Sequence, residues 1–429
     1  MRIGTSVPLK STEPIKAVGC PGGWFALDPI GYVCDDATLT RNLDDPYVKA
    51  LAIAAPSFDE LLPYRYALSG GAPMYGRLPT QEEQLKIEGP PDKRPAPPRM
   101  LKWAQGHEEL AQVEGGVSAT DEMPELFRDH KKLPTAQGLL EQRLVKKWIP
   151  VGSMLSFRQA FSFGGRTWLV TPDLALVPAD RVRLFKTSSF HGVELRDGLS
   201  LPLGWSRHEP VKKLKRTASG VEPTGDSWPV RTAIPLKERV EIQGKAYWTT
   251  RDTEVLVAEE SIGLAQQAEK LPATLPEGAH WIEVRGAAGT LVVYEGLKPV
   301  YATLMSTGLG GVGYGDNTTQ VKNSTTPVGL YRIQSKERAS TMSPEKGEPK
   351  EFWISDVPYI QYFRAPFAIH VAYWHEDFGM PKSAGCVNVS PEDGRWLFSW
   401  TDPPTIADWA ATVPAKSSTG LGSWVYVAK

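Results

Sequence analysis

The chain has 429 residues, of which 41% are hydrophobic and 23% charged, a composition typical of a globular protein and not of a disordered one. Its formal net charge of −1 argues against a sequence-independent nucleic-acid binder, because such proteins need an excess of lysine and arginine. The 39 glycines and 37 prolines favour short strands joined by turns over a helical bundle. At about 150 residues per domain, the length predicts about three domains.

The first residues, Met1 to Thr5, contain no apolar signal region, and no stretch approaches the roughly 20 apolar residues that cross a bilayer. We therefore expect no membrane span. The chain is either cytosolic or begins after a signal that has been removed, and the cysteines bear on that choice.

Cys20 and Cys34 lie close together near the N-terminus, whereas Cys386 is far from both. A close pair and one remaining cysteine favour one disulfide and one free thiol. Two buried, reduced thiols are the alternative, since free cysteine packs like a small apolar residue. A Cys20–Cys34 disulfide would indicate an extracytoplasmic protein.

Two different regions follow one another in the first third of the chain. Residues 14–60 contain β-forming aromatic residues between glycines, which predicts short strands. Residues 61–145 are predicted to form a helical insertion, because residues 100–113 and 137–149 have helical spacing of apolar positions. Within it, residues 88–99 contain five prolines and predict a stiff exposed linker.

An internal repeat occupies the middle of the chain. Residues 165–173 (GRTWLVTPD) recur as residues 244–252 (GKAYWTTRD), and the similarity continues past both copies. Each copy predicts a hairpin with an aromatic strand, a second turn and a further apolar strand. The duplication indicates two small β-barrels, at residues 146–200 and 201–270.

These repeats resemble bacterial SH3-like modules, and residues 14–60 resemble a more divergent third copy. In extracellular enzymes such modules often bind cell wall or pack against the catalytic domain. A scaffold with no ligand of its own is the alternative.

The C-terminal region places a cysteine and a histidine around one loop. Residues 367–371 predict a buried strand that carries His370. Residues 390–393 predict a helix start, with a serine cap, a proline at the first position and a carboxylate at the third. Cys386 lies between these two elements.

Cys386 could act as a nucleophile if a base removes its proton. Gly385 allows a tight turn that aims backbone N–H groups at one point, where they could stabilise an oxyanion. His370, 16 residues earlier, could return to the sulfur across the loop. The residues alone leave a structural Cys–His pair as the alternative.

Residues 370–388 resemble the signature of the L,D-transpeptidase catalytic domain family, in which a histidine and a long loop precede Ser-x-Gly-Cys-x-Asn or Arg. The resemblance spans residues 279–412, and further matching segments are Ser306–Gly308, Thr326–Tyr331, Val357–Tyr359, Tyr373–His375 and Phe378–Pro381. It implies a β-sandwich-like catalytic domain at residues 276–429. We therefore expect a mainly β chain with SH3-like barrels, a helical insertion and this domain.

The resemblance also implies roles for individual residues and no cofactor. Cys386 would be the nucleophile and His370 the base, oriented by a backbone carbonyl, with Gly385 beside the nucleophile. Ala384 stands where many members have histidine. Substrate contacts are expected from Ser383, Ala384, Asn388, Trp374, His375 and Tyr359. A core role for Trp374 and simple packing of His375 are the alternatives.

The implied function is peptidoglycan L,D-transpeptidation, in which a stem tetrapeptide is the donor and D-Ala leaves. The acceptor would be a second stem peptide, a protein lysine or water; water would make the enzyme an L,D-carboxypeptidase. A catalytically silent wall-binding protein and a wall hydrolase are the alternatives. We expect a periplasmic or cell-envelope location, because peptidoglycan lies there.

We predict no metal site, because the remaining histidines have no metal-ligand spacing. Their positions are His107, His130, His191, His208 and His280. No acidic third catalytic residue is expected, so Asp356 and Glu376 are interpreted as surface charges.

Overall fold

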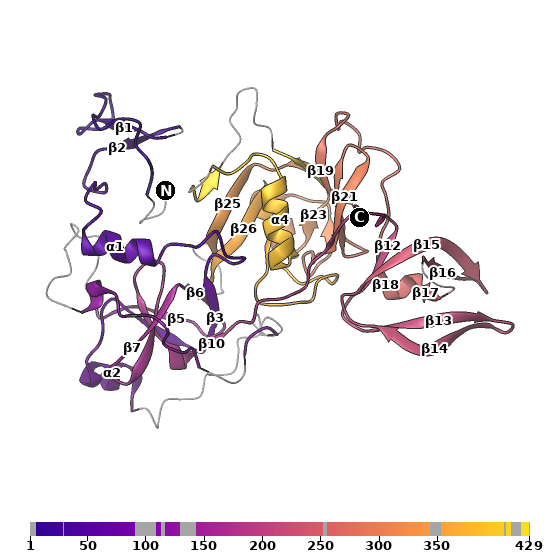
Figure 1. The fold of residues 1–429 in the computed structure, drawn as a ribbon, viewed down its shortest axis with the longest axis horizontal. Coiled ribbons are helices and arrows are strands. Elements are labelled where there is room, and N and C mark those ends of the chain that lie inside the picture. Colours follow the sequence, from indigo (N-terminus) through magenta and orange to yellow (C-terminus); the bar gives the residue numbers. More distant parts are fainter. Residues whose placement is uncertain are drawn as a thin grey trace. The chain divides into compact units, whose positions relative to one another are not determined.

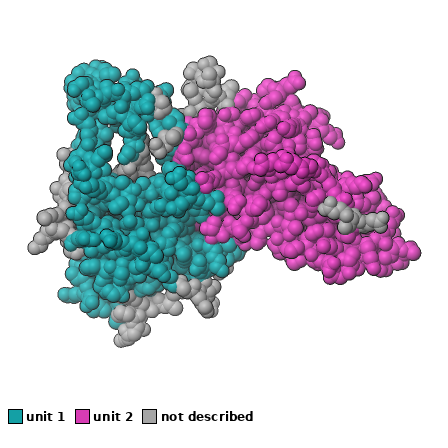
Figure 2. Space-filling view, viewed as in Figure 1, with its two compact units in different colours: residues 1–186, 341–356, 406–410 teal, residues 187–340, 357–405, 411–429 magenta. Residues whose placement is uncertain are grey.

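The structure, a computed structural model, describes residues 6–28, 30–90, 109–112, 116–128, 143–251, 255–343, 353–406, 409–412 and 422–428. The chain divides into two compact units, teal and magenta in Figure 2. Unit 1 comprises residues 1–186, 341–356 and 406–410, and unit 2 comprises residues 187–340, 357–405 and 411–429. The secondary structure is mainly β, as the composition predicts.

The N-terminal part of unit 1 is a small hairpin closed by a disulfide. Strands β1 (Trp24–Ala26) and β2 (Tyr32–Cys34) pair antiparallel, and Cys20 is bonded to Cys34. Helix α1 (Pro46–Ile53) follows, with Pro46 in its first turn. The assignment of residues 14–60 as an SH3-like module stays a prediction.

The remainder of unit 1 has strands where the sequence predicts a helical insertion. These strands are β3 (Arg65–Ser69), β4 (Ala72–Tyr75) and β5 (Val145–Ile149). They pair with β6 (Met154–Phe157), β9 (Leu176–Pro178) and β10 (Val182–Leu184). The helical interpretation is therefore wrong for residues 65–75 and 145–149.

Tertiary pairing explains this error. Apolar residues at 145, 148 and 149 fit helical spacing, but the run is short and β4 offers it a strand edge. Helix α2 (Gln81–Glu88) and the 3-10 turn η2 (Glu125–Phe127) do lie in the predicted insertion. Most of the proline-rich linker and the predicted helical residues 100–108 and 137–142 lie outside the described residues.

Both copies of the internal repeat have the strand order that the sequence predicts. The first copy contains β7 (Gln159–Phe163), β8 (Arg166–Val170), β9, η3 (Ala179–Arg181) and β10. The second contains β15 (Ala233–Ile242), β16 (Lys245–Thr250), β17 (Leu256–Ala258), η4 (Glu259–Ser261) and β18 (Ile262–Ala265). The two copies lie in different units.

The second copy is part of a seven-stranded sheet in unit 2, in the order β14-β13-β17-β16-β15-β12-β18. Its further strands are β12 (Leu203–Ser206), β13 (Val211–Thr217) and β14 (Gly220–Trp228). Strands β13 and β14 form a long hairpin (Figure 1). Leu236, Trp248 and Val257 are part of its core.

Two further sheets of unit 2 carry the C-terminal region. The first has the order β11-β21-β20-β19-β30-β24, with β11 (Val193–Glu194), β19 (His280–Arg285), β20 (Thr290–Glu295), β21 (Lys298–Leu304), β24 (Gly329–Arg332) and β30 (Trp424–Ala428). The second contains β25 (Ser335–Met342), β26 (Ile354–Arg364), β27 (Phe367–Val371) and β28 (Val387–Val389). Side chains from both sheets pack in one core, among them Ile282, Leu291, Phe363 and Ile369.

Short elements complete the region. They are β22 (Val312–Gly313), α3 (Asn317–Lys322), β23 (Thr326–Pro327), α4 (Pro391–Trp400) and β29 (Ala411–Thr412). In the part of the chain that the structure describes, no helix is both long and apolar enough to span a membrane.

Helix α4 follows β28 directly and lies beside β25 and β26 (Figure 1). It begins as predicted, with the Ser390 hydroxyl accepting from the N–H of Asp393 at 3.2 Å and Pro391 in the first turn. The carboxylate of Asp393 accepts from the hydroxyls of Tyr301 and Thr303, each at 2.6 Å. This buried carboxylate fixes the start of α4 to β21, and thereby the end of β28.

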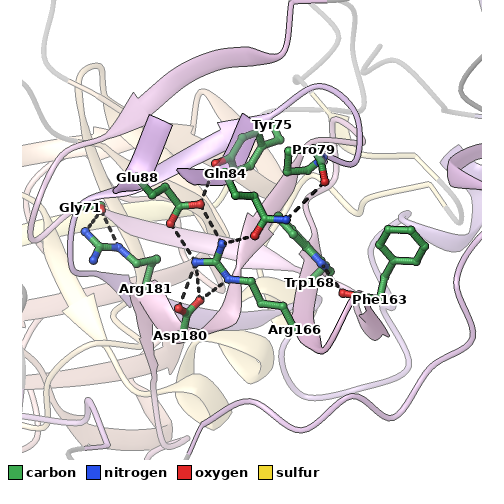
Figure 3. Close-up of polar contacts among 10 residues, drawn as sticks. All are labelled: Gly71, Tyr75, Pro79, Gln84, Glu88, Phe163, Arg166, Trp168, Asp180 and Arg181. Atoms are coloured by element: carbon green, nitrogen blue, oxygen red, sulfur yellow. Dashed lines mark hydrogen bonds and ion pairs between the residues drawn. The ribbon is translucent and has the colours of Figure 1, made fainter. Parts of the chain in front are cut away.

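A charged cluster in unit 1 links α2 to the first repeat (Figure 3). Arg166 forms bidentate hydrogen bonds to Glu88, at 2.8 Å for each oxygen, and it also contacts Asp180. Gln84 accepts a further bond from Arg166, and the Tyr75 hydroxyl donates to Glu88 at 2.7 Å. The side chain of Glu88 is only 2% exposed, so this carboxylate depends on its partners.

Asp356 in unit 1 is also buried, with 2% exposure. The hydroxyl of Ser156 donates to its carboxylate, and the Tyr66 hydroxyl donates to its backbone oxygen at 2.8 Å. The interpretation of Asp356 as a surface charge is therefore wrong.

Candidate active site

Strands β27 and β28 bring the cysteine loop to the histidine. They pair in parallel, with Ile369 opposite Val387 and His370 opposite Asn388. Cys386 directly precedes β28, and its sulfur contacts the backbone of Pro366 and Ala368 at the start of β27, the strand that carries His370.

The turn before the thiol is held by Ser383. Its hydroxyl donates to the backbone oxygen of Cys386 at 2.5 Å and accepts from the N–H of Gly385 at 3.0 Å. Gly385 has φ +130°, and a Cβ there would lie 2.7 Å from the ring of Phe367. Glycine is required at this position, but its N–H is already bonded. That backbone N–H groups around Gly385 and Cys386 hold an oxyanion stays a prediction.

Two of the other segments that resemble the family, residues 306–308 and 326–331, also lie at the loop that carries Cys386. The backbones of Ser306 and Asn388 exchange hydrogen bonds at 2.9 and 2.8 Å. The oxygen of Thr307 accepts from the N–H of Ser383 at 3.0 Å, and the Thr326 hydroxyl accepts from the N–H of Gly308 at 2.9 Å. Residues far apart in sequence thus support the thiol loop.

Cys386 is a partly exposed free thiol. Its sulfur lies 3.9 Å from the backbone oxygen of Pro366. Burial raises the pKa of the Cys386 thiol to about 11, and a hydrogen bond from the backbone of Ala368 only partly opposes this. Cys386 is therefore a neutral thiol at pH 7. Among the described residues, no hydrogen bond joins this sulfur to His370 in the resting structure.

His370 is 3% exposed, and its Nδ1 lies 2.9 Å from the backbone oxygen of Val371. A carbonyl oxygen only accepts, so Nδ1 carries the hydrogen and Nε2 keeps its lone pair. Burial lowers the pKa of His370 to about 4, against the effect of the hydrogen bond to Val371. The resting site thus holds a thiol and a neutral imidazole, and not an ion pair.

Residues 279–427 match the profile of the YkuD family, the L,D-transpeptidase catalytic domain. The C-terminal region of this chain is an L,D-transpeptidase catalytic domain. No curated protein matches the chain.

Solved L,D-transpeptidase structures are also similar to the chain. One from Stackebrandtia nassauensis is 24% identical over 38% of this chain and 58% of its own, with a TM-score of 0.23. One from Xylanimonas cellulosilytica is 19% identical over 37% of this chain and 64% of its own, with a TM-score of 0.23. L,D-transpeptidase 3 from Mycobacterium tuberculosis is 16% identical over 46% of this chain and 79% of its own, with a TM-score of 0.26. The chain thus spans less than two thirds of the first two structures, and the assignment of the domain rests on the family profile.

Most of the residues predicted to contact the substrate in the L,D-transpeptidase domain have buried side chains. Of the six residues, Ala384 is exposed, whereas the others are buried: Ser383, Asn388, Trp374, His375 and Tyr359. Tyr359 packs on Phe398 of α4, with ring centroids 5.5 Å apart. A buried side chain offers little surface to a substrate in the resting structure, and direct contact stays a prediction for all six residues.

Trp374 and His375 lie close to His370, the predicted general base. The Trp374 ring lies 6.1 Å from the His370 ring, and its exposure is 4%. Its indole Nε1 has no hydrogen-bond partner within the described residues. His375 is completely buried and hydrogen-bonds to Asn388 at 3.1 Å. The core role considered for Trp374 therefore fits better than a substrate wall.

Glu376 was interpreted as a surface charge, and this is wrong. Its carboxylate accepts from Arg231 at 2.8 Å and from the Ser188 hydroxyl at 2.5 Å. The side chains of Glu376 and Arg231 are only 25% and 26% exposed. This ion pair ties the loop after β27 to the segment before β15.

Tyr362 is a residue that the motif comparison missed. It lies opposite Ala368 in the β26–β27 pair, and the N–H of Ala368 contacts the sulfur. Burial, Glu337 and the charge of a Cys386 thiolate together raise the pKa of Tyr362 to about 12, so it is a neutral hydroxyl donor. Simple strand alternation could not have found it, because Tyr359, three residues earlier on β26, has φ +54° and interrupts the regular strand.

No cation site accompanies these groups in the part of the chain that the structure describes. No set of three or more histidine, cysteine, aspartate or glutamate side chains is arranged there to hold a metal ion.

Proposed function

We propose that this chain is a peptidoglycan L,D-transpeptidase in which Cys386 is the nucleophile and His370 the general base. The observation that supports the proposal is the contact of the Cys386 sulfur with the backbone at the start of β27, the strand that carries His370. The family of the domain supports the substrate class. The first four residues of a peptidoglycan stem would supply the donor.

The acylation half-reaction needs one proton acceptor. The Asn388 N–H₂ leaves Nε2 of His370, and the thiol proton moves to this nitrogen while the sulfur attacks the carbonyl carbon of the diamino acid at position 3. The C–N bond then breaks, and the proton on Nε2 passes to the leaving amine of D-Ala. A thioester on Cys386 remains, and His370 is neutral again.

The second half-reaction reverses these roles. An acceptor amine attacks the thioester carbon and gives its proton to Nε2, and the sulfur leaves and takes the proton back. A stem-peptide amine forms a 3-3 cross-link, and a protein lysine anchors that protein. Water would instead release a tripeptide.

The resting protonation states support a concerted proton transfer. Both groups are uncharged at neutral pH, because burial disfavours thiolate and imidazolium alike. A stored ion pair is therefore absent from our mechanism, and the proton moves as the sulfur attacks. This keeps the thiol unreactive until a peptide carbonyl arrives.

Two donors are candidates for the oxyanion that forms during the attack. Since the N–H of Gly385 is bonded to Ser383, we propose the N–H of Cys386 and the hydroxyl of Tyr362. A donor of this kind contributes about 3 kcal/mol to transition-state stabilisation.

We place this activity in the cell envelope, where the proposed substrate lies. The Cys20–Cys34 disulfide supports this location, because disulfides persist in oxidising compartments.

Labelling of the thiol tests the nucleophile. We expect a carbapenem to add its mass once to the intact protein, with the adduct mapping to Cys386 by peptide mass spectrometry. Cys386→Ala should fold with an unchanged melting curve and take no adduct. Labelling that persists in Cys386→Ala would refute the assignment.

Reaction with disaccharide-tetrapeptides tests the activity. Mass spectrometry should show a cross-linked dimer and released D-Ala. A tripeptide without dimer would indicate a carboxypeptidase. No reaction by a protein that still binds peptidoglycan would indicate a silent wall-binding protein.

A further inference from the structure

A chain of four hydrogen bonds connects the loop after β27 to the base. The N–H of Asp377 lies 3.2 Å from Nδ1 of His375, and Nε2 of His375 lies 3.1 Å from Oδ1 of Asn388. Nδ2 of Asn388 lies 3.1 Å from Nε2 of His370, whose Nδ1 lies 2.9 Å from the oxygen of Val371. The side chains of His375, Asn388 and His370 are therefore hydrogen-bonded in series.

Backbone groups at the two ends fix the direction of this chain. The Asp377 N–H can only donate, so Nδ1 of His375 accepts and a neutral His375 carries its hydrogen on Nε2. That N–H donates to Oδ1 of Asn388, which turns the Asn388 amide N–H₂ toward His370. At the other end, the Val371 oxygen can only accept, which leaves Nε2 of His370 as the acceptor.

We propose that His375 is a positioning residue for the catalytic base: through Asn388 it keeps the hydrogen of His370 on Nδ1 and the lone pair on Nε2, which can take the thiol proton once the Asn388 N–H₂ has left it. The inference rests on the proposed function only in taking His370 as the base. His375 contacts neither thiol nor substrate in this role and acts through Asn388.

Reversing the direction of these hydrogen bonds shows why they select one tautomer of each histidine. If the Asn388 amide turned over, its N–H₂ would face the N–H on Nε2 of His375, and two donors would meet. His375 could relieve this only by moving its hydrogen to Nδ1, which would then face the N–H of Asp377. A hydrogen on Nε2 of His370 would likewise face the N–H₂ of Asn388. The chain thus favours one tautomer of each histidine.

Burial gives this selection its energetic weight. His375, Asn388 and His370 are 0%, 1% and 3% exposed, so water cannot replace a lost partner. A buried polar group without a partner is costly, and networks of this kind are satisfied in one arrangement only.

The loop that carries His375 is anchored on both sides. Glu376 is paired with Arg231, and the Asp377 carboxylate accepts from Lys382 at 2.5 Å. Phe378 stacks on Phe190, with ring centroids 5.5 Å apart. These contacts hold the Asp377 N–H where it sets the tautomer of His375.

The charged and titratable groups around His370 come from four elements. Glu376, Asp377 and Lys382 lie on its own loop and are paired as described above. Cys386 precedes β28, Tyr362 lies on β26, and Asp393 on α4 accepts from Tyr301 and Thr303. The carboxylates are thus held by partners of their own.

Nuclear magnetic resonance of the imidazole nitrogens tests the inference directly. Two-bond ¹H–¹⁵N spectra of ¹⁵N-labelled protein at pH 7, assigned with single histidine variants, report the tautomer of each ring. We expect the Nδ1–H tautomer for His370 and the Nε2–H tautomer for His375. The Nδ1–H tautomer at His375, or fast exchange between tautomers at either ring, would overturn the inference.

Substitution tests the consequence for the reaction. His375→Leu removes the donor to Asn388, whereas His375→Gln keeps an N–H donor near the position of Nε2. We expect His375→Leu to slow carbapenem acylation of Cys386 about tenfold or more, because the base is no longer held in place. His375→Gln should stay close to wild type. His208→Leu, at a half-exposed site, is the matched control and should have no effect.

The pH profile separates positioning from general structural support. In His375→Leu the Asn388 amide can turn its oxygen toward His370, so the acid limb of the acylation profile should move to higher pH. His375→Gln should keep the wild-type limb. A slower but unshifted profile in His375→Leu, or equal rates for the Leu and Gln variants, would contradict positioning.

Failure of the inference and of the proposed function are distinguishable. If wild-type protein is not acylated at Cys386, the proposed function fails. The measured histidine tautomers still test the direction of the hydrogen bonds that link His375, Asn388 and His370. If His375→Leu does not fold, the wild-type tautomers and the Gln variant decide. If acylation is intact but His375 has the other tautomer, only the inference fails.

Discussion

The Arg166 cluster of unit 1 and the His370 chain of unit 2 are both buried and hydrogen-bonded, but they are built from opposite chemistry. Arg166 is surrounded by carboxylates and an amide, and its charge is part of the resting state. His370 is neutral, and its partners Asn388 and His375 are uncharged in the arrangement that their hydrogen bonds define.

The difference indicates what each cluster is for. A guanidinium holds its proton at all accessible pH values, so the Arg166 cluster can fix structure but cannot exchange a proton. An imidazole nitrogen with a lone pair can accept a proton, and the directional hydrogen bonds keep this lone pair on Nε2 of His370, where the Asn388 N–H₂ contacts it at rest. The paired charges of the Arg166 cluster therefore stabilise structure. The directional hydrogen bonds between neutral groups at His370 suit a site of proton transfer.

The largest expected effect is on the reaction rate and comes from substitution of His370. We expect His370→Gln to lower the acylation rate of Cys386 by roughly 10²- to 10⁴-fold, the range of general-base contributions. Stopped-flow measurement with a carbapenem checks this. His208→Gln serves as the control, and a loss of less than fivefold, roughly, in His370→Gln would contradict its role as the base.

The next effect is on stability, at the charged cluster. Arg166→Met leaves the buried carboxylate of Glu88 without its cation, which costs about 3–5 kcal/mol. Denaturant unfolding should show this loss, and the acylation rate of the folded protein should be unchanged. The double variant with Glu88→Gln should recover part of the loss. An equal loss in the double variant would exclude a charge effect.

A pH-dependent effect should follow from His370. In the unfolded chain a histidine binds a proton below about pH 6.5, whereas folded His370 binds one only near pH 4. Between these values the unfolded state holds more protons, so stability falls as the pH is lowered, by on the order of 3 kcal/mol. The difference between wild type and His370→Gln in chemical denaturation from pH 7 to 4 measures it. Parallel stability curves would contradict the lowered pKa.

The smallest effect should come from the second copy of the repeat. Glu259 occupies the position of Asp180 but pairs with Arg239, whose side chain is 49% exposed. Solvent screens this pair, so Arg239→Ala should lower the midpoint of thermal unfolding far less than Arg166→Met does. Thermal unfolding beside Arg166→Met compares the two copies, and a similar loss for both would refute burial as the cause of the difference.

The sequence predicted features that depend on neighbours in the chain. The duplicated hairpins, the cap of α4 at Ser390 and the thiol loop around Gly385 follow from local spacing and backbone preference. Comparison of the motif with a family added the pairing of Cys386 with His370, which stays a prediction. Strands β3 to β5 were missed, because their partners lie far along the chain.

The sequence by itself determined which residue types are available for the chemistry: one free thiol, one histidine at the end of a strand and a glycine where φ is positive. Only the tertiary structure decided their surroundings. Burial sets the protonation of Cys386 and His370, and contacts between distant segments set the direction of the Asn388 amide. Both depend on which groups exclude water from a given atom, and this is a property of the packed protein and not of any local pattern.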